Sequence, residues 1–127
     1  MDCRESVALV LEDTDLGRWA LTHALEARGY EVHAPWTWAE ASVWLHRAKV
    51  CLALVAVTSP GQAAEVTAEV NWYPHTHLVL LAEEDQVDDL RLACGPGPDI
   101  LSKPFNLGEV DRIAVSCQGM DDEARGA

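Results

Sequence analysis

Short apolar runs alternate along this chain with longer segments in which apolar residues recur every three or four positions. The short runs predict strands buried on both faces, and the longer segments predict amphipathic helices. The predicted strands cover residues 6–11, 30–34, 50–57, 77–82 and 99–102. The predicted helices cover residues 15–28, 37–47, 60–70, 83–93 and 107–117. One strand and one helix therefore alternate five times.

Turn and capping residues mark the ends of these elements. Asp13 or Thr14 suits the N-cap of the first predicted helix, and Ser59 suits that of the third. Pro60 fits a first helical position, and Gly29 fits the residue that ends a helix. The inward side of the first helix is expected to carry Leu16, Ala20, Ala24 and Ala27, with Leu21 and Leu25 beside them.

This alternation predicts an α/β fold. Right-handed crossovers between successive strands give a doubly wound (βα)5 domain, with a five-stranded parallel sheet and helices on both faces. The natural strand order for five such units is 2-1-3-4-5, the flavodoxin-like arrangement. The chain of 127 residues is long enough for one core. We expect one domain at residues 1–118, followed by a flexible C-terminal tail at 119–127 that is small and polar.

The charge balance narrows the choice of partners. Lys and Arg number 9 and Asp and Glu number 21, for a formal net charge of −12. Nucleic acid is not an expected partner, because phosphate neutralisation needs clustered cations. A basic protein partner is compatible with this charge. No apolar run approaches a membrane span and the N-terminus lacks the pattern of a signal peptide, so we expect a soluble cytoplasmic protein.

Three features converge on the carboxyl edge of the predicted sheet. Glu12 and Asp13 follow the first strand, and Ala56 ends the third strand. Lys103, Pro104 and Phe105 follow the fifth. In open α/β sheets this edge is where ligands and chemistry are placed.

With these motifs at these spacings, the chain resembles a response-regulator receiver domain over about residues 5–117. The resemblance implies that an aspartate ending the third strand accepts a phosphoryl group from a histidine kinase. It implies that the acid pair holds Mg²⁺ with that aspartate, and that the lysine after the fifth strand binds the phosphoryl oxygens. A hydroxyl residue ending the fourth strand and an aromatic residue in the fifth strand complete the implied switch.

The chain departs from this pattern at three positions. The implied phospho-acceptor position is Ala56, which cannot be phosphorylated, and the two switch positions are Ala82 and Ile100. Glu12 and Asp13 then form at most a weak or vestigial Mg²⁺ site, because one of three carboxylates is missing. Lys103 remains as a vestigial phosphate site. Its expected role is to neutralise Glu12 and Asp13, and it is expected to pair with Asp13.

We therefore expect an atypical receiver, a pseudo-receiver of two-component or phosphorelay signalling that works through protein–protein interaction without phosphorylation. Its partner is expected to be another protein or a second copy of the chain. The alternative is a flavodoxin-like module that senses a small ligand at the same sheet edge. No catalytic residues and no cofactor beyond weakly held Mg²⁺ are expected, because no nucleophile–base set is visible.

The chain holds five tryptophans, which is many for its length. Trp36 and Trp38 lie beside the start of the second predicted helix and are candidates for an interaction surface. Trp19 and Trp44 are expected to pack within the domain. A metal pair at His75 and His77 is not expected, because no third ligand is near in the sequence.

Overall fold

The computed structural model describes residues 6–103 and 106–126, with side chains as far as Cys117. This part of the chain holds the strands β1 (Ser6–Leu11), β2 (Tyr30–His33), β3 (Val50–Ala56), β4 (His77–Glu83) and β5 (Asp99–Lys103). Its helices are α1 (Asp15–Glu26), α2 (Trp38–Arg47), α3 (Pro60–Val70), the short 3-10 helix η1 (Glu84–Gln86), α4 (Val87–Cys94) and α5 (Leu107–Gly126). None of these helices is long and apolar enough to cross a lipid bilayer.

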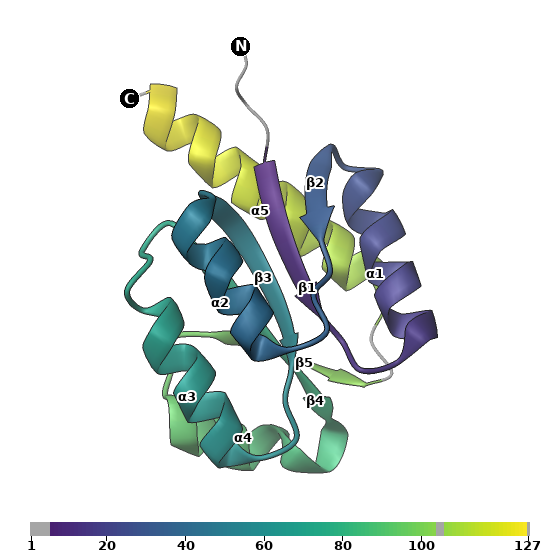
Figure 1. Cartoon of the computed structure of the whole chain (residues 1–127), viewed down its shortest axis with the longest axis vertical. Helices are drawn as coiled ribbons and strands as arrows, with labels where there is room; N and C mark the ends of the chain where they lie inside the picture. The colour runs from purple at the N-terminus through teal and green to yellow at the C-terminus, as the bar shows by residue number, and fades with distance from the viewer. Residues whose placement is uncertain (1–5, 104–105, 127) are drawn as a thin grey trace.

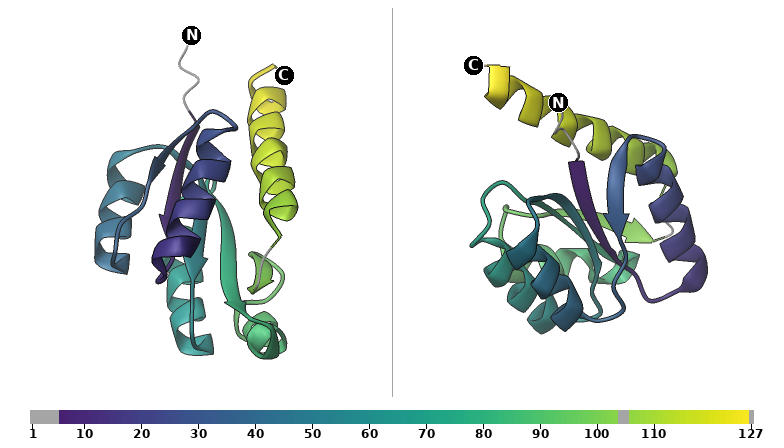
Figure 2. Two further views of the ribbon diagram at one scale, coloured as in Figure 1. Left: turned by 90° about the vertical axis from the view of Figure 1, so that its right-hand side faces the viewer. Right: turned by 45° about the horizontal axis from the view of Figure 1, so that its top comes forward.

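The strands form one parallel sheet in the order β2-β1-β3-β4-β5, which confirms the predicted flavodoxin-like topology (Figure 1). Two further views show the helices lying in two layers on either side of the sheet (Figure 2). The register pairs Leu11 of β1 with Val55 of β3, and Glu83 of β4 with Lys103 of β5. The residues that follow β1, β3 and β5 therefore meet at one edge.

The sheet separates two apolar clusters, because its central strands bury side chains on both faces. Along β3, Ala53 and Val55 face one cluster and Leu52 and Leu54 face the other. The first cluster is completed by α2, α3 and α4 through Ala41, Leu45, Ala63, Val66, Val70 and Leu90. The second cluster is completed by α1 and α5 through Leu21, Leu25, Val110 and Ala114.

Side chains cap the N-termini of the first three helices, and those of the first and third are among the predicted ones. The hydroxyl of Thr14 accepts a hydrogen bond from the Gly17 amide at 3.1 Å, which decides between Thr14 and Asp13. Thr37 caps α2 in the same way, and Ser59 caps α3. A cap of this kind contributes about 1 kcal/mol to stability, because it satisfies an amide that has no helical partner.

Leu16 does not face the core, which corrects the predicted inward stripe of the first helix. Its side chain is 75% exposed, whereas Leu21 and Leu25 are fully buried. An α-helix turns by about 100° per residue, so Leu16 lies about 140° around α1 from Leu21. The sequence is compatible with two apolar stripes on α1. The stripe that contains Leu21 and Leu25 is the one that packs on the sheet.

The last helix ends later than predicted. The sequence predicts an end near Cys117, but the backbone of α5 remains helical as far as Gly126. The Tyr30 hydroxyl donates to the carbonyl of Ala114 at 2.7 Å, and Arg28 forms an ion pair with Asp111 at 2.8 Å. These contacts hold the first part of α5 against β2 and the turn that follows α1. The division of the chain into a domain at 1–118 and a tail at 119–127 stays a prediction.

The two leucine positions on α1 provide a matched test of this packing. We expect Leu25→Ala to lower the free energy of unfolding by about 2–5 kcal/mol, because it leaves a cavity in the core. Leu16→Ala should change it by less than about 0.5 kcal/mol, as is usual for exposed positions. Urea unfolding monitored by circular dichroism measures both. Equal losses in the two variants would contradict the observed orientation of α1.

Candidate functional site

The carboxyl edge of the sheet brings together the acid pair and the lysine that the sequence singled out. Lys103 Nζ lies 2.9 Å from Glu12 Oε1 and 3.6 Å from Asp13 Oδ1. Glu12 follows Leu11, which is paired with Val55, so the register aligns it with Ala56 at the end of β3. Pro104 and Phe105, the rest of the lysine motif, lie outside the described residues.

Glu12 is a buried carboxylate whose two oxygens are both hydrogen-bonded. Its side chain is only 3% exposed. Oε1 accepts from the Lys103 ammonium at 2.9 Å and from the Asp13 amide at 3.2 Å. Oε2 accepts from the Thr14 hydroxyl at 2.8 Å. A buried charge is stable only when it is paired and hydrogen-bonded, and Glu12 meets both conditions.

The position of Glu12 depends on a glycine in the first turn of α1. A Cβ built on Gly17 would lie 2.0 Å from Glu12 Oε2 and 2.7 Å from the Thr14 hydroxyl oxygen. Any larger residue at 17 would displace the carboxylate. Sequence reasoning missed Gly17, although a glycine near the start of an otherwise well-formed helix is itself a signal of close approach.

Lys103 and the acid pair stabilise one another's charges. Partial burial works against the Lys103 ammonium, but the hydrogen bond and charge of Glu12 outweigh it. With the charges of Asp13 and Glu83 added, the pKa of Lys103 lies above its usual value. Burial also works against the Asp13 carboxylate. The charge of Lys103 nevertheless lowers the pKa of Asp13.

These residues do not fit the Mg²⁺ site that the resemblance implies. Mg²⁺ takes octahedral oxygen ligands, but both oxygens of Glu12 are already bonded within the protein and Ala56 supplies none. The ammonium of Lys103 offsets one of the two carboxylate charges, and it lies closer to Glu12 than to Asp13, the partner that the sequence predicts. Across the described residues, no three His, Cys, Asp or Glu side chains gather to hold a metal. Weak binding of Mg²⁺ stays a prediction.

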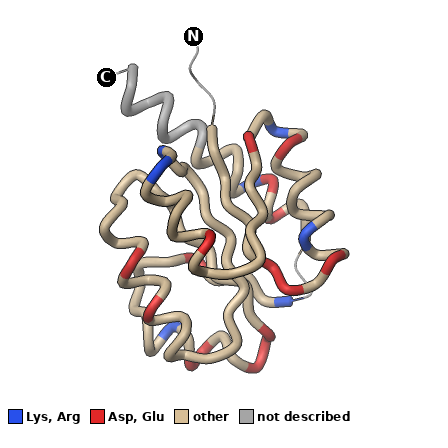
Figure 3. Tube along the Cα trace, in the orientation of Figure 1, with Lys and Arg blue, Asp and Glu red and all other residues tan. Residues whose placement is uncertain are grey.

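The two switch positions are both apolar contacts of the core. Ala82 is buried at the end of β4, and Ile100 packs partly buried against the same cluster. Beyond them lies a hollow of about 510 Å³ lined by Glu83, Glu84, Asp85 and Lys103. Acidic residues surround this edge in the charge-coloured trace (Figure 3). The hollow is therefore acidic, and it offers an anion little except the already paired lysine.

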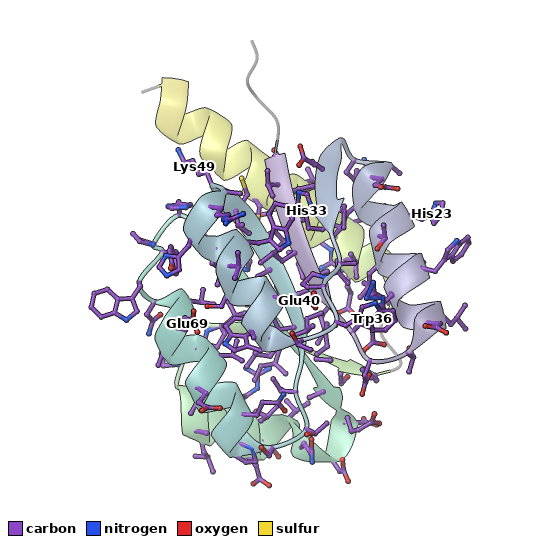
Figure 4. The ribbon with its side chains drawn as sticks, viewed as in Figure 1. His23, His33, Trp36, Glu40, Lys49 and Glu69 are labelled. Atoms are coloured by element: carbon purple, nitrogen blue, oxygen red, sulfur yellow. The ribbon has the colours of Figure 1, made fainter. Side chains whose placement is uncertain are left out.

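The two candidate tryptophans have different surroundings. Trp38 packs against the core, and its indole N–H donates to Glu69 at 3.0 Å. Trp36 is 60% exposed and is labelled near α1 in Figure 4. The Arg18 guanidinium lies 3.5 Å from the centroid of the Trp36 ring and donates to the carbonyls of Ala34 and Pro35. The two indoles therefore do not form one open surface.

The other aromatic predictions divide in the same way. Trp44 packs partly buried and stacks on His33 with ring centroids 3.8 Å apart, which confirms its expected packing. The prediction for Trp19 is wrong, because its side chain is 61% exposed on the outward side of α1.

His77 is hydrogen-bonded to Asp99 at 2.8 Å. The described cysteines are free thiols. Burial is the main cause that raises the pKa of the Cys117 thiol to about 11.

The arrangement of this domain is that of response-regulator receiver domains. The chain matches the crystal structure of a response regulator from Thermotoga maritima with a TM-score of 0.70 and 22% identity, over 91% of this chain and 98% of that one. It matches the receiver domain of Francisella response regulator 1452 with a TM-score of 0.76 and 16% identity, over 92% and 99%. The C-terminus of E. coli RcsC, which contains a linker region and a phosphoreceiver domain, matches with a TM-score of 0.80 and 17% identity, over 100% and 51%.

These likenesses establish the receiver fold. No family model matches the chain. No curated protein matches it either.

Replacing Lys103 should destabilise the protein, because the buried Glu12 carboxylate loses its charged partner. We expect Lys103→Met to lower the free energy of unfolding by about 3 kcal/mol, because Glu12 is left charged and unpaired. Glu12→Gln should cost about 1–2 kcal/mol, since the amide keeps part of the network. The double variant should lose clearly less than the sum, as measured by urea unfolding in a double-mutant cycle. Strict additivity would contradict the pairing.

Two glycines near helix starts provide a second matched comparison. Gly17→Ala should destabilise the protein by about 1–3 kcal/mol, because it pushes the Glu12 carboxylate out of its hydrogen bonds. Gly61→Ala in α3 meets no atom within 4 Å and should be neutral or stabilise by up to about 1 kcal/mol. Thermal and urea unfolding of both variants measure this. A stabilising Gly17→Ala would show that Glu12 does not need the space.

Proposed function

We propose that this chain is a receiver-like module of two-component signalling that acts by binding another protein and never carries a phosphoryl group. The observation that carries the proposal is the methyl group of Ala56 at the end of β3. In a receiver that position must hold a nucleophilic carboxylate. A methyl group has no lone pair with which to attack phosphorus and cannot form an acyl phosphate, so under this proposal the covalent switch is absent.

The surrounding residues support the same reading. No acid lies between positions 50 and 64, so no neighbouring carboxylate can replace the one missing at the end of β3. Thr58 carries the first hydroxyl after Ala56 in the sequence, and this hydroxyl is hydrogen-bonded to the Gln62 side chain at 3.2 Å. Lys103, which would bind a phosphoryl group, is already paired with Glu12. The buried carboxylate at this edge thus has its partner without metal or phosphate.

The likeness to receiver domains supports a signalling role at the level of the fold. Receiver domains signal through surfaces that bind other proteins, and such binding does not require the surface to catalyse a reaction. We propose further that the chain has no enzymatic activity and no resident cofactor, and that it acts in the cytoplasm in contact with another protein.

The proposal is tested by incubating the protein with acetyl phosphate and Mg²⁺ and measuring its intact mass. We expect no phosphoprotein, because position 56 has no acceptor. A receiver domain with an acceptor aspartate, treated in the same tube, is the positive control. Appearance of a hydroxylamine-sensitive phosphorylated species of this chain would overturn the proposal, since that sensitivity identifies an acyl phosphate.

The small-ligand alternative requires a place for the ligand at the carboxyl edge of the sheet. A ligand at the carboxyl edge would lie in the hollow lined by Glu83, Glu84, Asp85 and Lys103. Three carboxylates against one ammonium favour a cationic compound there. Thermal-shift screening separates the two functions, because a specific ligand raises the melting temperature as its concentration rises.

A further inference from the structure

We propose that Cys51 and Cys117 are an oxidation site, at which hydrogen peroxide joins the two thiols in an intramolecular disulfide that ties α5 to β3. The site lies at the opposite end of the sheet from Lys103 and the acid pair, because Cys51 stands at the start of β3 and Ala56 at its end. The proposal goes beyond the proposed function and does not rest on it.

An irregularity in β3 turns the Cys51 side chain toward α5. Val7 of β1 pairs with Val50 of β3. The next residue, Ala8, pairs with Leu52, so Cys51 is an extra residue in β3. A bulge of this kind re-aims a side chain that strict alternation would send to the other face of the sheet. Leu52 is buried in the cluster that α1 and α5 complete, and Cys51 packs against that same cluster.

Cys117 approaches the same end of the sheet from α5. It follows Ala114 by about one turn, and it packs against the cluster in which Ala114 is buried. The Ala114 carbonyl accepts from the hydroxyl of Tyr30, which begins β2 and pairs with Ser6 at the start of β1. In Figure 1, α5 passes behind the beginnings of β1 and β3. Cα atoms of α5 and β3 accordingly come within 8 Å of one another.

The two thiols are neighbours, and one of them lines a cavity. Burial raises the pKa of Cys117, and the charge of Cys51 adds to the rise, as a charge does only for a nearby group. Cys117 also lines a cavity of about 280 Å³ whose walls include the exposed side chains of Glu109 and Arg112. A cavity of this size holds several water molecules, so hydrogen peroxide can enter it from solvent.

The oxidation takes two steps. The Cys117 thiolate attacks a peroxide oxygen and the O–O bond breaks, which gives a sulfenic acid and one water. The Cys51 sulfur then attacks the sulfenic sulfur, the S–O bond breaks, and a second water leaves. Two thiols and one peroxide thus give one disulfide and two waters, which carry the thiol protons, and two electrons pass from sulfur to oxygen. The first step is slow, because the thiolate is the nucleophile and the raised pKa of Cys117 makes it scarce.

The disulfide requires only a small movement of α5. A disulfide spans Cα atoms about 4–7 Å apart, which the approach of α5 to β3 nearly provides. Its closure ties residues 51 and 117 into one loop and removes entropy from the unfolded chain, so the oxidised protein should be the more stable form. Cys94 is no rival partner, because it packs against the cluster on the opposite face of the sheet.

A metal ion shared by the two thiols is a less suitable occupant of this site. Across the part of the chain that the structure describes, no three His, Cys, Asp or Glu side chains gather around one point. Two thiols alone leave a tetrahedral metal short of ligands. A disulfide needs no third group.

The test treats the whole reduced protein at micromolar concentration with millimolar hydrogen peroxide, followed by trypsin digestion without reductant and mass spectrometry. Lys or Arg separates each cysteine from the next, so the four cysteines fall on four different peptides. We expect the peptide of residues 50–91 to be linked to that of residues 113–125, with the loss of two hydrogen atoms. Dithiothreitol should separate them. The melting temperature of the oxidised protein should rise by at least about 5 °C.

Matched variants identify the two partners. Cys51→Ser should abolish both the linked peptides and the rise in melting temperature. Cys94→Ser changes a cysteine on the other face of the sheet and should leave both results as they are in the unaltered protein. Circular dichroism confirms that each variant is folded before oxidation.

The proposal is overturned if the two peptides are not linked, or if Cys51 or Cys117 is found joined to another cysteine instead. Accumulation of sulfinic acid at Cys117 while Cys51 stays a free thiol would show that the two sulfurs do not meet. Linked peptides that come only from a covalent dimer on a non-reducing gel would also overturn it, because the proposed bond lies within one chain.

Discussion

The ion pair between the Glu12 carboxylate and the Lys103 ammonium is the contact on which the carboxyl edge of this domain depends. It joins the end of β1 to the end of β5, although β3 and β4 lie between these strands. Ala56, at the end of β3, adds no carboxylate of its own to this pair. A buried carboxylate without such a partner would cost several kcal/mol or take up a proton. The pair therefore stabilises the buried charge of Glu12 and fixes the end of β1 relative to the end of β5.

Most of the fold was predictable because local and long-range signals agree in this chain. β1 and α3 have the predicted bounds, since an apolar run and a Ser-Pro start leave little freedom. The errors occur where several local solutions are equally good. The sequence predicts inward positions for Leu16 and Trp19, because α1 has apolar residues on more than one side. It predicts too early an end for α5, because small polar residues carry only a weak signal for where a helix stops.

The candidate site was predictable in its members and not in its geometry. Spacing alone identified Glu12, Asp13, Ala56 and Lys103 as neighbours at one edge. Spacing could not decide which acid would be buried, because that choice depends on the room beside α1. Gly17 provides that room by lacking a Cβ, and its effect on Glu12 becomes visible only in three dimensions. The consequence is that a helix residue, and not the acid pair itself, determines where the carboxylate points.

The methyl group of Ala56 also changes what kind of quantity this domain can report. A phosphorylated receiver exists in two chemical forms, and the ratio of those forms carries the message. A chain without a phosphorylated form has no such ratio, so under the proposed function its message is its own abundance. The amount of the protein would then be controlled by its rates of synthesis and degradation instead of by a kinase. The response would change only as fast as those rates allow.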